Sequence, residues 1–211
     1  MKKEKVLKKI NPLFLKGICH RGLHNDKFIE NGMLAFKNAL DNNMALELDI
    51  HLTKDNELVV IHDSELKRVT GKDGIVEDLT LKELKVFRKN YVPLASRLKK
   101  ELECVKDKSN YLLISFDPRA LFQFKKSGYV RQLLLTTEKK YRYVYHFRHF
   151  FEGVDLDYKY LEERKARRYC KKHFSNIWTI ESKEVFDKYY KDVDCISFQH
   201  IDPYYIKEML K

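Results

Sequence analysis

The chain has 211 residues and a formal net charge of +11. This length corresponds to one domain with at most a small insertion. The apolar content of 44%, with 13 Phe and 13 Tyr, supports a sizeable core and excludes a mainly disordered chain. Only 7 Gly and 4 Pro are present, which excludes low-complexity and collagen-like proteins. The positive charge favours anionic partners such as phosphate esters, anionic lipid or nucleic acid.

In chain order, short apolar strands alternate with amphipathic helices. This rhythm predicts an α/β fold with a parallel sheet, either open or closed into a barrel. The predicted strands are 16–19, 45–50, 58–61, 111–115, 132–135, 154–156, 177–180 and 195–198. The predicted helices are 33–40, 81–87, 119–126, 183–190 and 205–210. Thr80 and Glu83 have the spacing of a capping box at the start of the second helix.

One pair of strands breaks this rhythm. The connection between 45–50 and 58–61 has only seven residues, whereas a parallel crossover needs a dozen or more. We therefore predict an antiparallel pair, with the second strand beginning an excursion from the main sheet that runs to about residue 90.

The four cysteines do not form a CxxC pair or a disulfide framework. Cys19, Cys104, Cys170 and Cys195 are expected to be free buried thiols in a reducing compartment. The apolar run 13–15 is too short for a signal-peptide core, and no window approaches a membrane span of ~20 residues. These features predict a soluble, cytoplasmic protein.

The densest group of polar residues follows the first strands. His20 and Arg21 come directly after one strand, Glu47 and Asp49 alternate within the next, and His62 ends the antiparallel strand. Active sites of barrels and doubly wound sheets lie at such strand ends. Two carboxylates on one face are costly to desolvate without a cation, and a hard divalent ion would suit them. The histidines could supply acid and base, and the arginine could bind an anionic oxygen.

Less specific interpretations apply to several neighbouring residues. Asp63 is more often a helix cap or an orienting group than a metal ligand. His24 and His51 are expected to be structural or solvent-facing. The basic and aromatic stretch 141–151 could stack nucleic-acid bases, but an amphipathic packing element is favoured because no nucleic-acid-binding module is recognisable.

These motifs together closely resemble the glycerophosphodiester phosphodiesterases. The similarity is highly specific from residue 18 to 84 and looser afterwards. The matching segments are His20–His24, Glu30-Asn31, Ala35-Phe36, Glu47–Asp55, Val59–Asp63, Thr70-Gly71, Leu79–Leu84, Ile114–Pro118, Val154–Asp157, Trp178–Ile180 and Cys195–Pro203.

The resemblance implies metal-dependent hydrolysis of glycerophosphodiesters to glycerol 3-phosphate and an alcohol. It assigns His20 and His62 as the catalytic acid–base pair and Arg21 as the phosphate-binding residue. It assigns Glu47 and Asp49 to a divalent cation, Ca²⁺ or Mg²⁺. The implied partner is a small-molecule substrate. A weak contact with an anionic membrane surface is compatible with the charge, and nucleic acid is not favoured.

The resemblance also implies a TIM-barrel-like fold of the PLC-like phosphodiesterase type. Residues 1–211 would form a single catalytic domain, with 53–90 as a small insertion after the second strand. Glu30 and Asn31 match a loop motif of the family, although Ile29 stands where a proline is usual.

One βα unit is missing from this pattern. The family has a third strand that carries a metal-binding Glu and a phosphate-facing Lys, but residues 92–110 contain no equivalent. We therefore expect a barrel shortened to seven main strands. The side chains that could replace the missing carboxylate are Asp117, Asp155, Asp157 and Glu181.

Three hypotheses follow from these observations. The first is an active phosphodiesterase, favoured by the intact histidines and carboxylates. The second is a pseudoenzyme or phosphodiester-binding protein on the same scaffold, favoured by the missing strand. The third is a basic protein that binds lipid or nucleic-acid surfaces, favoured by charge alone.

Overall fold

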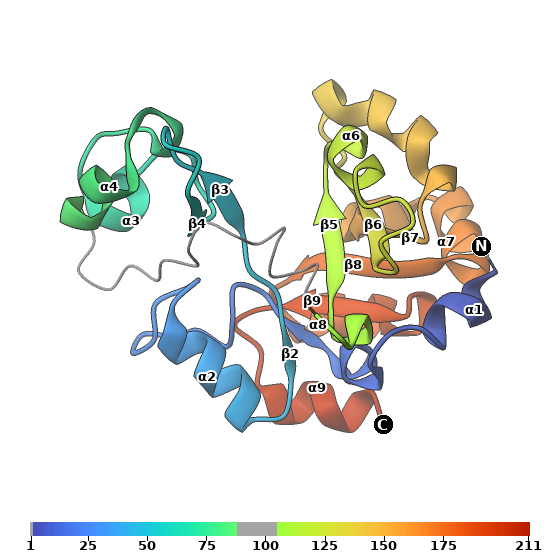
Figure 1. Ribbon diagram of the computed structural model, residues 1–211. Coiled ribbons are helices and arrows are strands. Elements are labelled where there is room, and N and C mark those ends of the chain that lie inside the picture. Colours follow the sequence, from blue (N-terminus) through green and yellow to red (C-terminus); the bar gives the residue numbers. More distant parts are fainter. Residues whose placement is uncertain (1, 88–104) are drawn as a thin grey trace. The chain divides into compact units, whose positions relative to one another are not determined.

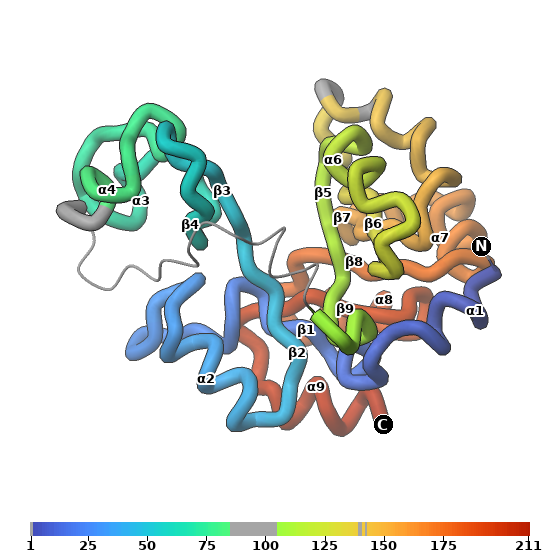
Figure 2. Tube along the Cα trace, viewed as in Figure 1, coloured from blue at the N-terminus to red at the C-terminus, as the bar shows by residue number. Residues whose placement is uncertain are grey.

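The computed structural model describes residues 2–87 and 105–211. The chain divides into two compact units, whose segments can be followed by colour in Figure 2. The sheet unit comprises Met1–Cys19, Asn43–Ala45 and Lys106–Lys211. The hairpin unit comprises His20–Asn42 and Leu46–Val105.

A seven-stranded sheet forms the framework of the sheet unit (Figure 1). The chain passes from this unit into the hairpin unit within the edge strand β2 (Ala45–Leu46), between its two residues. The strand order is β2-β1-β9-β8-β7-β6-β5, and the five pairs from β1 to β5 in this order are all parallel. The strands are β1 (Ile18–Cys19), β2 (Ala45–Leu46), β5 (Leu112–Ser115), β6 (Val130–Leu135), β7 (Gly153–Asp157), β8 (Phe174–Ile180) and β9 (Cys195–Phe198).

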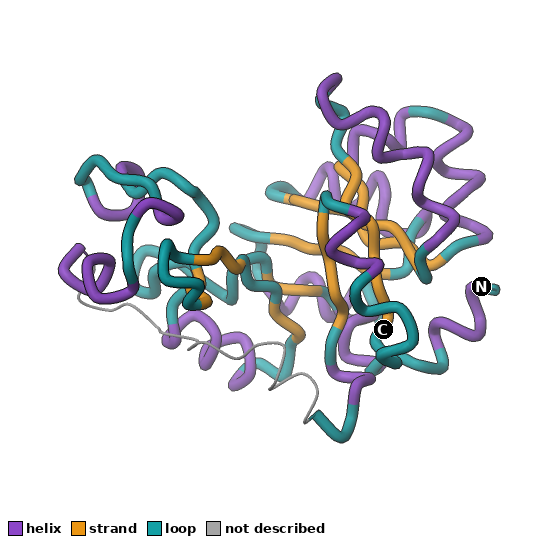
Figure 3. The backbone as a smooth tube through the Cα atoms, turned by 45° about the horizontal axis from the view of Figure 1, so that its top comes forward, coloured by secondary structure: helices purple, strands orange, loops and turns teal. Residues whose placement is uncertain are grey.

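Helical segments connect these strands (Figure 3). The α-helices of the sheet unit are α1 (Lys3–Leu7), α6 (Pro118–Phe122), α7 (Arg164–Lys172), α8 (Lys183–Tyr189) and α9 (Pro203–Met209). The 3₁₀ segments are η1 (Pro12–Lys16), η3 (Lys108–Asn110), η4 (Lys139–Phe150), η5 (Tyr158–Glu162) and η6 (Tyr190–Asp192). In the part of the chain that the structure describes, no helix is long and apolar enough to cross a membrane.

The core of the sheet unit is buried on both faces of its central strands. Strand β9 is buried throughout, and β6, β7 and β8 are buried at most positions. Such two-sided burial is characteristic of parallel sheets covered by helices. Val6 and Phe14 carry α1 and η1 into an apolar cluster with Phe174. Three of the four cysteines are free and buried, as predicted, whereas Cys104 lies outside the described residues.

The seven main strands of the described residues agree with the prediction of a shortened, TIM-barrel-like sheet. Strands β2 and β5 are the two ends of the strand order. Among the described residues between β4 and β5, the only further strand-like pairing is the isolated bridge between Glu65 and Ile75. Most of the segment expected to lack the third strand, residues 88–104, lies outside the described residues.

The predicted strand 45–50 is wrong as a single element. The structure has β2, then a segment without regular secondary structure at 47–49, and then β3 (Ile50–Leu52). Strand β2 belongs to the main sheet, whereas β3 pairs with β4 (Leu58–Val60) in a separate two-stranded sheet. The chain therefore leaves the main sheet between Leu46 and Ile50. The antiparallel pairing predicted for the second strand is confirmed.

In its described residues, the hairpin unit contains the β3–β4 pair and four short helical segments. These are α2 (Met33–Asp41), α3 (Lys67–Thr70), η2 (Val76–Asp78) and α4 (Leu81–Phe87). Buried Val59, Leu66 and Leu84 belong to its apolar cluster. The capping box at α4 is confirmed, because the Thr80 N–H donates to Glu83 Oε2 at 2.8 Å and the Glu83 N–H donates back to Thr80 Oγ1 at 3.3 Å.

Candidate active site

All five predicted site residues lie in the hairpin unit, which begins at His20. His20 is half-buried and opens a tight turn after β1. Arg21 and Gly22 both have positive φ, at 55° and 80°. A Cβ on Gly22 would lie 2.9 Å from the Phe36 ring, so the left-handed backbone and the lack of space both require glycine. The turn brings the Arg21 backbone N–H to 3.1 Å from Oε2 of Glu47.

The Arg21 side chain is enclosed by acidic groups. Its Nη1 donates to Oε1 of Glu30 at 2.9 Å, and its Nε lies 3.5 Å from Oδ2 of Asp49. Only 14% of the side chain is exposed, so these charges interact in a partly desolvated environment. Arg21 thereby contacts Glu47 through its backbone and Asp49 through its guanidinium. The two carboxylates converge on one residue although the segment that carries them is not a continuous strand.

Asn31 also binds Asp49. Its Nδ2 donates to Oδ2 of Asp49 at 3.0 Å, and its Oδ1 accepts from the Asp49 backbone N–H at 3.3 Å. The Asn31 backbone N–H donates to the carbonyl oxygen of Arg21 at 2.9 Å. Asn31 is 3% exposed and holds a φ of 53°, which asparagine tolerates better than most residues. The loop motif predicted from sequence therefore supports the site structurally.

His62 is oriented by the residue that follows it. Its Nδ1 lies 2.6 Å from Oδ1 of Asp63, and 42% of its side chain is exposed. Burial raises the pKa of Asp63, but hydrogen bonds from Arg68 and His62 outweigh burial and lower it. An ionised Asp63 holds a proton on Nδ1 of His62 and leaves Nε2 available for proton transfer. The interpretation of Asp63 as an orienting group agrees with this geometry.

Arg68, at the start of α3, connects the histidine to the arginine side of the site. Its Nη1 and Nη2 donate to the two carboxylate oxygens of Glu30 at 3.0 and 2.7 Å, and its Nε donates to Oδ2 of Asp63. Burial raises the pKa of Glu30, but the hydrogen bonds and charges of Arg68 and Arg21 overcome it and lower the pKa to about 2. Glu30 is therefore a fixed anion between two guanidinium groups.

Sequence reasoning missed Arg68. It is five residues from Asp63 but 38 residues from Glu30, and no local pattern indicates the second contact. Only the chemistry of the residues could have indicated this contact. The Glu30 carboxylate in the candidate site needs a cationic partner, and the Arg68 guanidinium in the insertion can bind a carboxylate with two hydrogen bonds.

His51 has a structural role. Its Nδ1 lies 2.7 Å from Oε1 of Glu77, and its Nε2 lies 2.9 Å from the carbonyl oxygen of His62. Ser64 donates to the other carboxylate oxygen of Glu77. Both ring nitrogens of His51 are engaged, so it supports the backbone at His62.

The carboxylates of Glu47 and Asp49 fit a hard divalent cation that takes only a few of its ligands from the protein. Both residues offer carboxylate oxygens, the ligand type that Mg²⁺ and Ca²⁺ prefer. Within residues 2–87 and 105–211, no group of three or more His, Cys, Asp or Glu side chains is arranged to hold a metal. Glu30 is committed to two arginines. Two protein carboxylates suit Mg²⁺, which keeps several waters, better than Ca²⁺, which takes six to eight oxygen ligands.

The four carboxylates suggested as replacements all belong to the sheet unit, where each has a local environment of its own. Asp117 caps α6 and pairs with Arg119, and Asp157 caps η5. Glu181 accepts from Nε2 of Gln199. Asp155 is buried in β7, and burial raises its pKa to about 8. These contacts do not single out one of them as a metal ligand.

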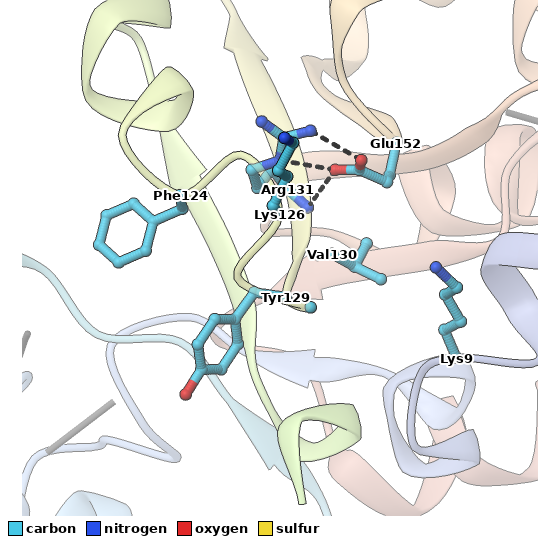
Figure 4. Close-up of a pocket in the computed structure, with 8 residues that line it drawn as sticks. Lys9, Phe124, Lys126, Tyr129, Val130, Arg131 and Glu152 are labelled. Atoms are coloured by element: carbon cyan, nitrogen blue, oxygen red, sulfur yellow. Dashed lines mark hydrogen bonds and ion pairs between the residues drawn. The ribbon is translucent and has the colours of Figure 1, made fainter. Parts of the chain in front are cut away.

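A pocket of about 200 Å³ lies at the beginning of β6 in the sheet unit (Figure 4). Lys9, Lys126 and Tyr129 are among its lining residues. Arg131 in its wall is neutralised by Glu152, to whose carboxylate it donates at 2.9 and 2.8 Å. Its volume is below the roughly 300 Å³ at which small-molecule sites begin. It contains none of the predicted catalytic residues.

A family model matches more than half of the chain. The glycerophosphoryl diester phosphodiesterase family is matched by residues 20–149, a segment that contains every candidate site residue named above in the hairpin unit. A Bacillus altitudinis protein named glycerophosphodiester phosphodiesterase is 46% identical over 71 residues, 33% of this chain and 29% of that protein. A human lysophospholipase D is 46% identical over 70 residues, 33% of this chain and 22% of that protein. The chain thus matches less than a third of the length of these relatives.

Solved structures resemble most of the chain. A glycerophosphodiester phosphodiesterase from Thermotoga maritima has a TM-score of 0.70 at 24% identity, covering 92% of this chain and 96% of that one. A phosphodiesterase from Oleispira antarctica, solved with the product sn-glycerol-3-phosphate, has a TM-score of 0.63 at 19% identity, covering 92% and 95%. At these identities the likeness establishes the fold.

Proposed function

The chain belongs to the glycerophosphoryl diester phosphodiesterase family, and on this premise we propose that it hydrolyses glycerophosphodiesters to glycerol 3-phosphate and an alcohol. The names of the matched relatives support this reaction class, and the matched segment contains the whole candidate site. We further propose that residues 1–211 act as one catalytic domain, with 53–90 as an insertion that supplies His62, Asp63 and Arg68 to the site.

In this proposal, His20 and His62 divide the acid and base roles. Asp63 occupies Nδ1 of His62, so the proton is taken up or released at Nε2. One histidine removes a proton from the nucleophile, and the other protonates the leaving alcohol. Attack by water gives glycerol 3-phosphate directly, whereas attack by the neighbouring glycerol hydroxyl gives a cyclic phosphate that water then opens to glycerol 3-phosphate. Positioned acids and bases of this kind contribute on the order of 10²–10⁴-fold each.

Arg21 binds the anionic phosphodiester, and Glu30 holds its guanidinium in place. Glu47 and Asp49 are the residues that would hold a divalent cation. Such an ion, when bound, stabilises the charge that develops on the phosphoryl oxygens. Asn31 keeps the Asp49 carboxylate in position through the contacts described above.

The observation that carries the proposal is the continuous chain of contacts from His62 through Asp63, Arg68 and Glu30 to Arg21. It ties the acid–base residue to the phosphate-binding residue within one unit. The test is hydrolysis of glycerophosphocholine by the wild type with Mg²⁺, with Ca²⁺ and with EDTA. The amount of glycerol 3-phosphate released is the quantity measured. We expect turnover that EDTA abolishes.

A second candidate is a phosphodiester-binding pseudoenzyme. It is favoured by the finding that the described residues contain no group of three metal-binding side chains. This candidate predicts that glycerophosphocholine binds to the wild type but is released unchanged at every metal concentration. Equal background hydrolysis by wild type, His20→Ala and His62→Ala at saturating Mg²⁺ would establish it.

The cation assignment is tested separately by calorimetric titration with Mg²⁺. Glu47→Gln should weaken binding, because it removes a charged oxygen donor. Glu65→Gln is the matched control, because Glu65 is an exposed glutamate of the same unit outside the site. Equal Mg²⁺ affinity in Glu47→Gln and in the control would remove Glu47 from the cation site.

A further inference from the structure

The net charge of the protein is concentrated in two short segments of the sheet unit. Residues 2–9, which contain α1, and residues 164–172, which form α7, hold 11 of the 42 basic residues and 1 of the 31 acidic residues. They therefore account for +10 of the net charge of +11. The other 194 residues are almost neutral as a group, with 31 basic and 30 acidic side chains.

Most of these cations face solvent. Nine are exposed, and we call them the basic surface: Lys2, Lys5, Lys8, Lys9, Arg164, Lys165, Arg168, Lys171 and Lys172. Among the residues that the structure describes, the one cation of these segments that forms an ion pair is Lys3, which lies 2.9 Å from Asp194. No acidic side chain of the described residues forms an ion pair with the basic surface.

The two segments are in contact, although 155 residues of the chain lie between Lys9 and Lys165. Lys3 Nζ donates to the carbonyl oxygen of Cys170 at 3.0 Å, which ties α1 to the last turn of α7 (Figure 1). Both helices also pack against β8. The apolar side of each helix points inward, because Val6, Ala166 and Cys170 are buried. Each helix therefore presents its charged side outward.

We propose that the basic surface docks on an anionic phospholipid bilayer. Basic clusters near a negatively charged leaflet bind by electrostatic attraction, at about fivefold in affinity per Lys or Arg. The buried apolar sides leave no hydrophobic face to insert, so the binding is superficial and strongly salt-dependent.

A bilayer fits this surface better than a single-stranded nucleic acid. Sequence-tolerant binding of single strands needs exposed aromatic rings on which the bases stack. The exposed side chains of α1 and α7 are all charged, and the one aromatic residue, Tyr169, stacks at 3.9 Å on His173. A charge-dense plane of lipid headgroups makes no such demand. The inference is independent of the proposed hydrolysis, because it uses no residue of the candidate active site.

The test is flotation of the full chain with vesicles of phosphatidylcholine containing phosphatidylglycerol, and with vesicles of phosphatidylcholine alone. We expect binding to the anionic vesicles only, with loss at high NaCl. The triple variant Lys165→Glu, Arg168→Glu, Lys172→Glu should bind at least ~100-fold more weakly, from three contributions of the size given above. These three positions repeat at helical spacing, and all are exposed.

The matched control is Lys54→Glu, Lys82→Glu, Lys183→Glu, which changes the net charge equally at exposed positions outside the basic surface. It should retain most of the vesicle binding. Equal loss in both triple variants would overturn the proposal, because binding would then follow net charge alone. Tighter binding of a duplex or single-stranded oligonucleotide than of the anionic vesicles would also overturn it. Circular dichroism of both variants verifies folding, and turnover of glycerophosphocholine reports separately on the proposed function.

Discussion

One carboxyl group in each unit has a strongly shifted pKa, and the two shifts have opposite directions. In the hairpin unit, Glu30 is partly exposed and held by two arginines, so its pKa is lowered to about 2. In the sheet unit, Asp155 is 3% exposed and its main polar neighbour is Asn176, so burial raises its pKa to about 8. The difference shows that burial and the available partner together set the protonation state of a carboxyl group. A guanidinium keeps the charge, whereas an amide does not compensate for lost water.

The polar layer around Asp155 is short of hydrogen-bond donors. The Asn176 amide donates to Oγ of Ser197 at 2.8 Å. Asp155 Oδ1, Asn176 Oδ1 and Gln132 Oε1 are buried and lack a donor among the described residues. Asp155 and Asn176 are register partners on β7 and β8. A proton retained on Asp155 supplies one of the missing donors, which agrees with its raised pKa.

Replacing His62, one of the two proposed acid–base residues of the hairpin unit, should have the largest effect on activity. His62→Ala should lower kcat for glycerophosphocholine by on the order of 10²–10⁴-fold, because proton transfer at Nε2 is lost. Thermal unfolding should change little, since the side chain is 42% exposed. The control is His146→Ala, which alters an exposed histidine of the sheet unit. Similar losses in both variants would exclude a specific role for His62.

Replacing Arg68, which links Asp63 to Glu30, should have the second-largest effect on activity. Arg68→Ala should lower kcat by about 10²-fold, because Asp63 and Glu30 lose their common partner and the site geometry loosens. Arg68→Lys should rescue little, because lysine lacks the planar fork that reaches Glu30 and Asp63 together. The matched control is the neighbouring Lys67→Ala, whose partner Asp73 is almost fully exposed. Full activity of Arg68→Lys would show that charge alone suffices.

In the sheet unit, Asp155→Asn should change stability rather than chemistry. The folded pKa of about 8 lies above the ordinary value of 3.8, so the unfolded chain ionises first. Stability from this group is full below about pH 4 and is lost as the pH rises to 8. Asparagine removes this dependence and supplies a permanent donor. The free energy of unfolding of the variant, relative to that of the wild type, should therefore rise by about 2–3 kcal/mol from pH 5 to pH 7.

Urea unfolding at pH 5 and pH 7 measures this gain. Asp117→Asn is the control, because asparagine caps α6 as well as aspartate does and 42% of this side chain is exposed. A pH-independent difference between Asp155→Asn and the wild type would contradict a raised pKa in the fold.

Glu30→Gln should give the smallest effect, with the opposite pH dependence. The folded pKa of about 2 lies below the ordinary 4.5, so the wild-type stabilisation is present above pH 4.5 and is lost as the pH falls towards 2. The variant should lose about 1–3 kcal/mol near neutral pH, where Arg21 and Arg68 keep their charge without an anion. Urea titrations at pH 3 and pH 7 should show the difference shrinking in acid. A loss that grows in acid would reverse the sign expected here.

Local patterns in the sequence determined much of the architecture. Helix 81–87 begins at the predicted residue, because its capping box acts within a few residues. Strand 195–198 is also reproduced, because a buried apolar run between turns has few alternatives. The antiparallel pair followed from chain length, since seven residues cannot cross a parallel sheet. The motif residues around His20, Glu47 and His62 were recognised, because each lies within two residues of the end of a short apolar strand.

Only the tertiary structure decided the remaining features, because they depend on residues far apart in the chain. The predicted strand 45–50 divides because its two ends pair with different sheets. Arg68 joins Glu30 to Asp63 across the insertion, and neither neighbour is visible in a local pattern. The burial that raises the pKa of Asp155, and the contact that joins α1 to α7, arise from packing across the sheet unit. Burial and long-range ion pairs are properties of the folded neighbourhood, and a linear spacing does not encode them.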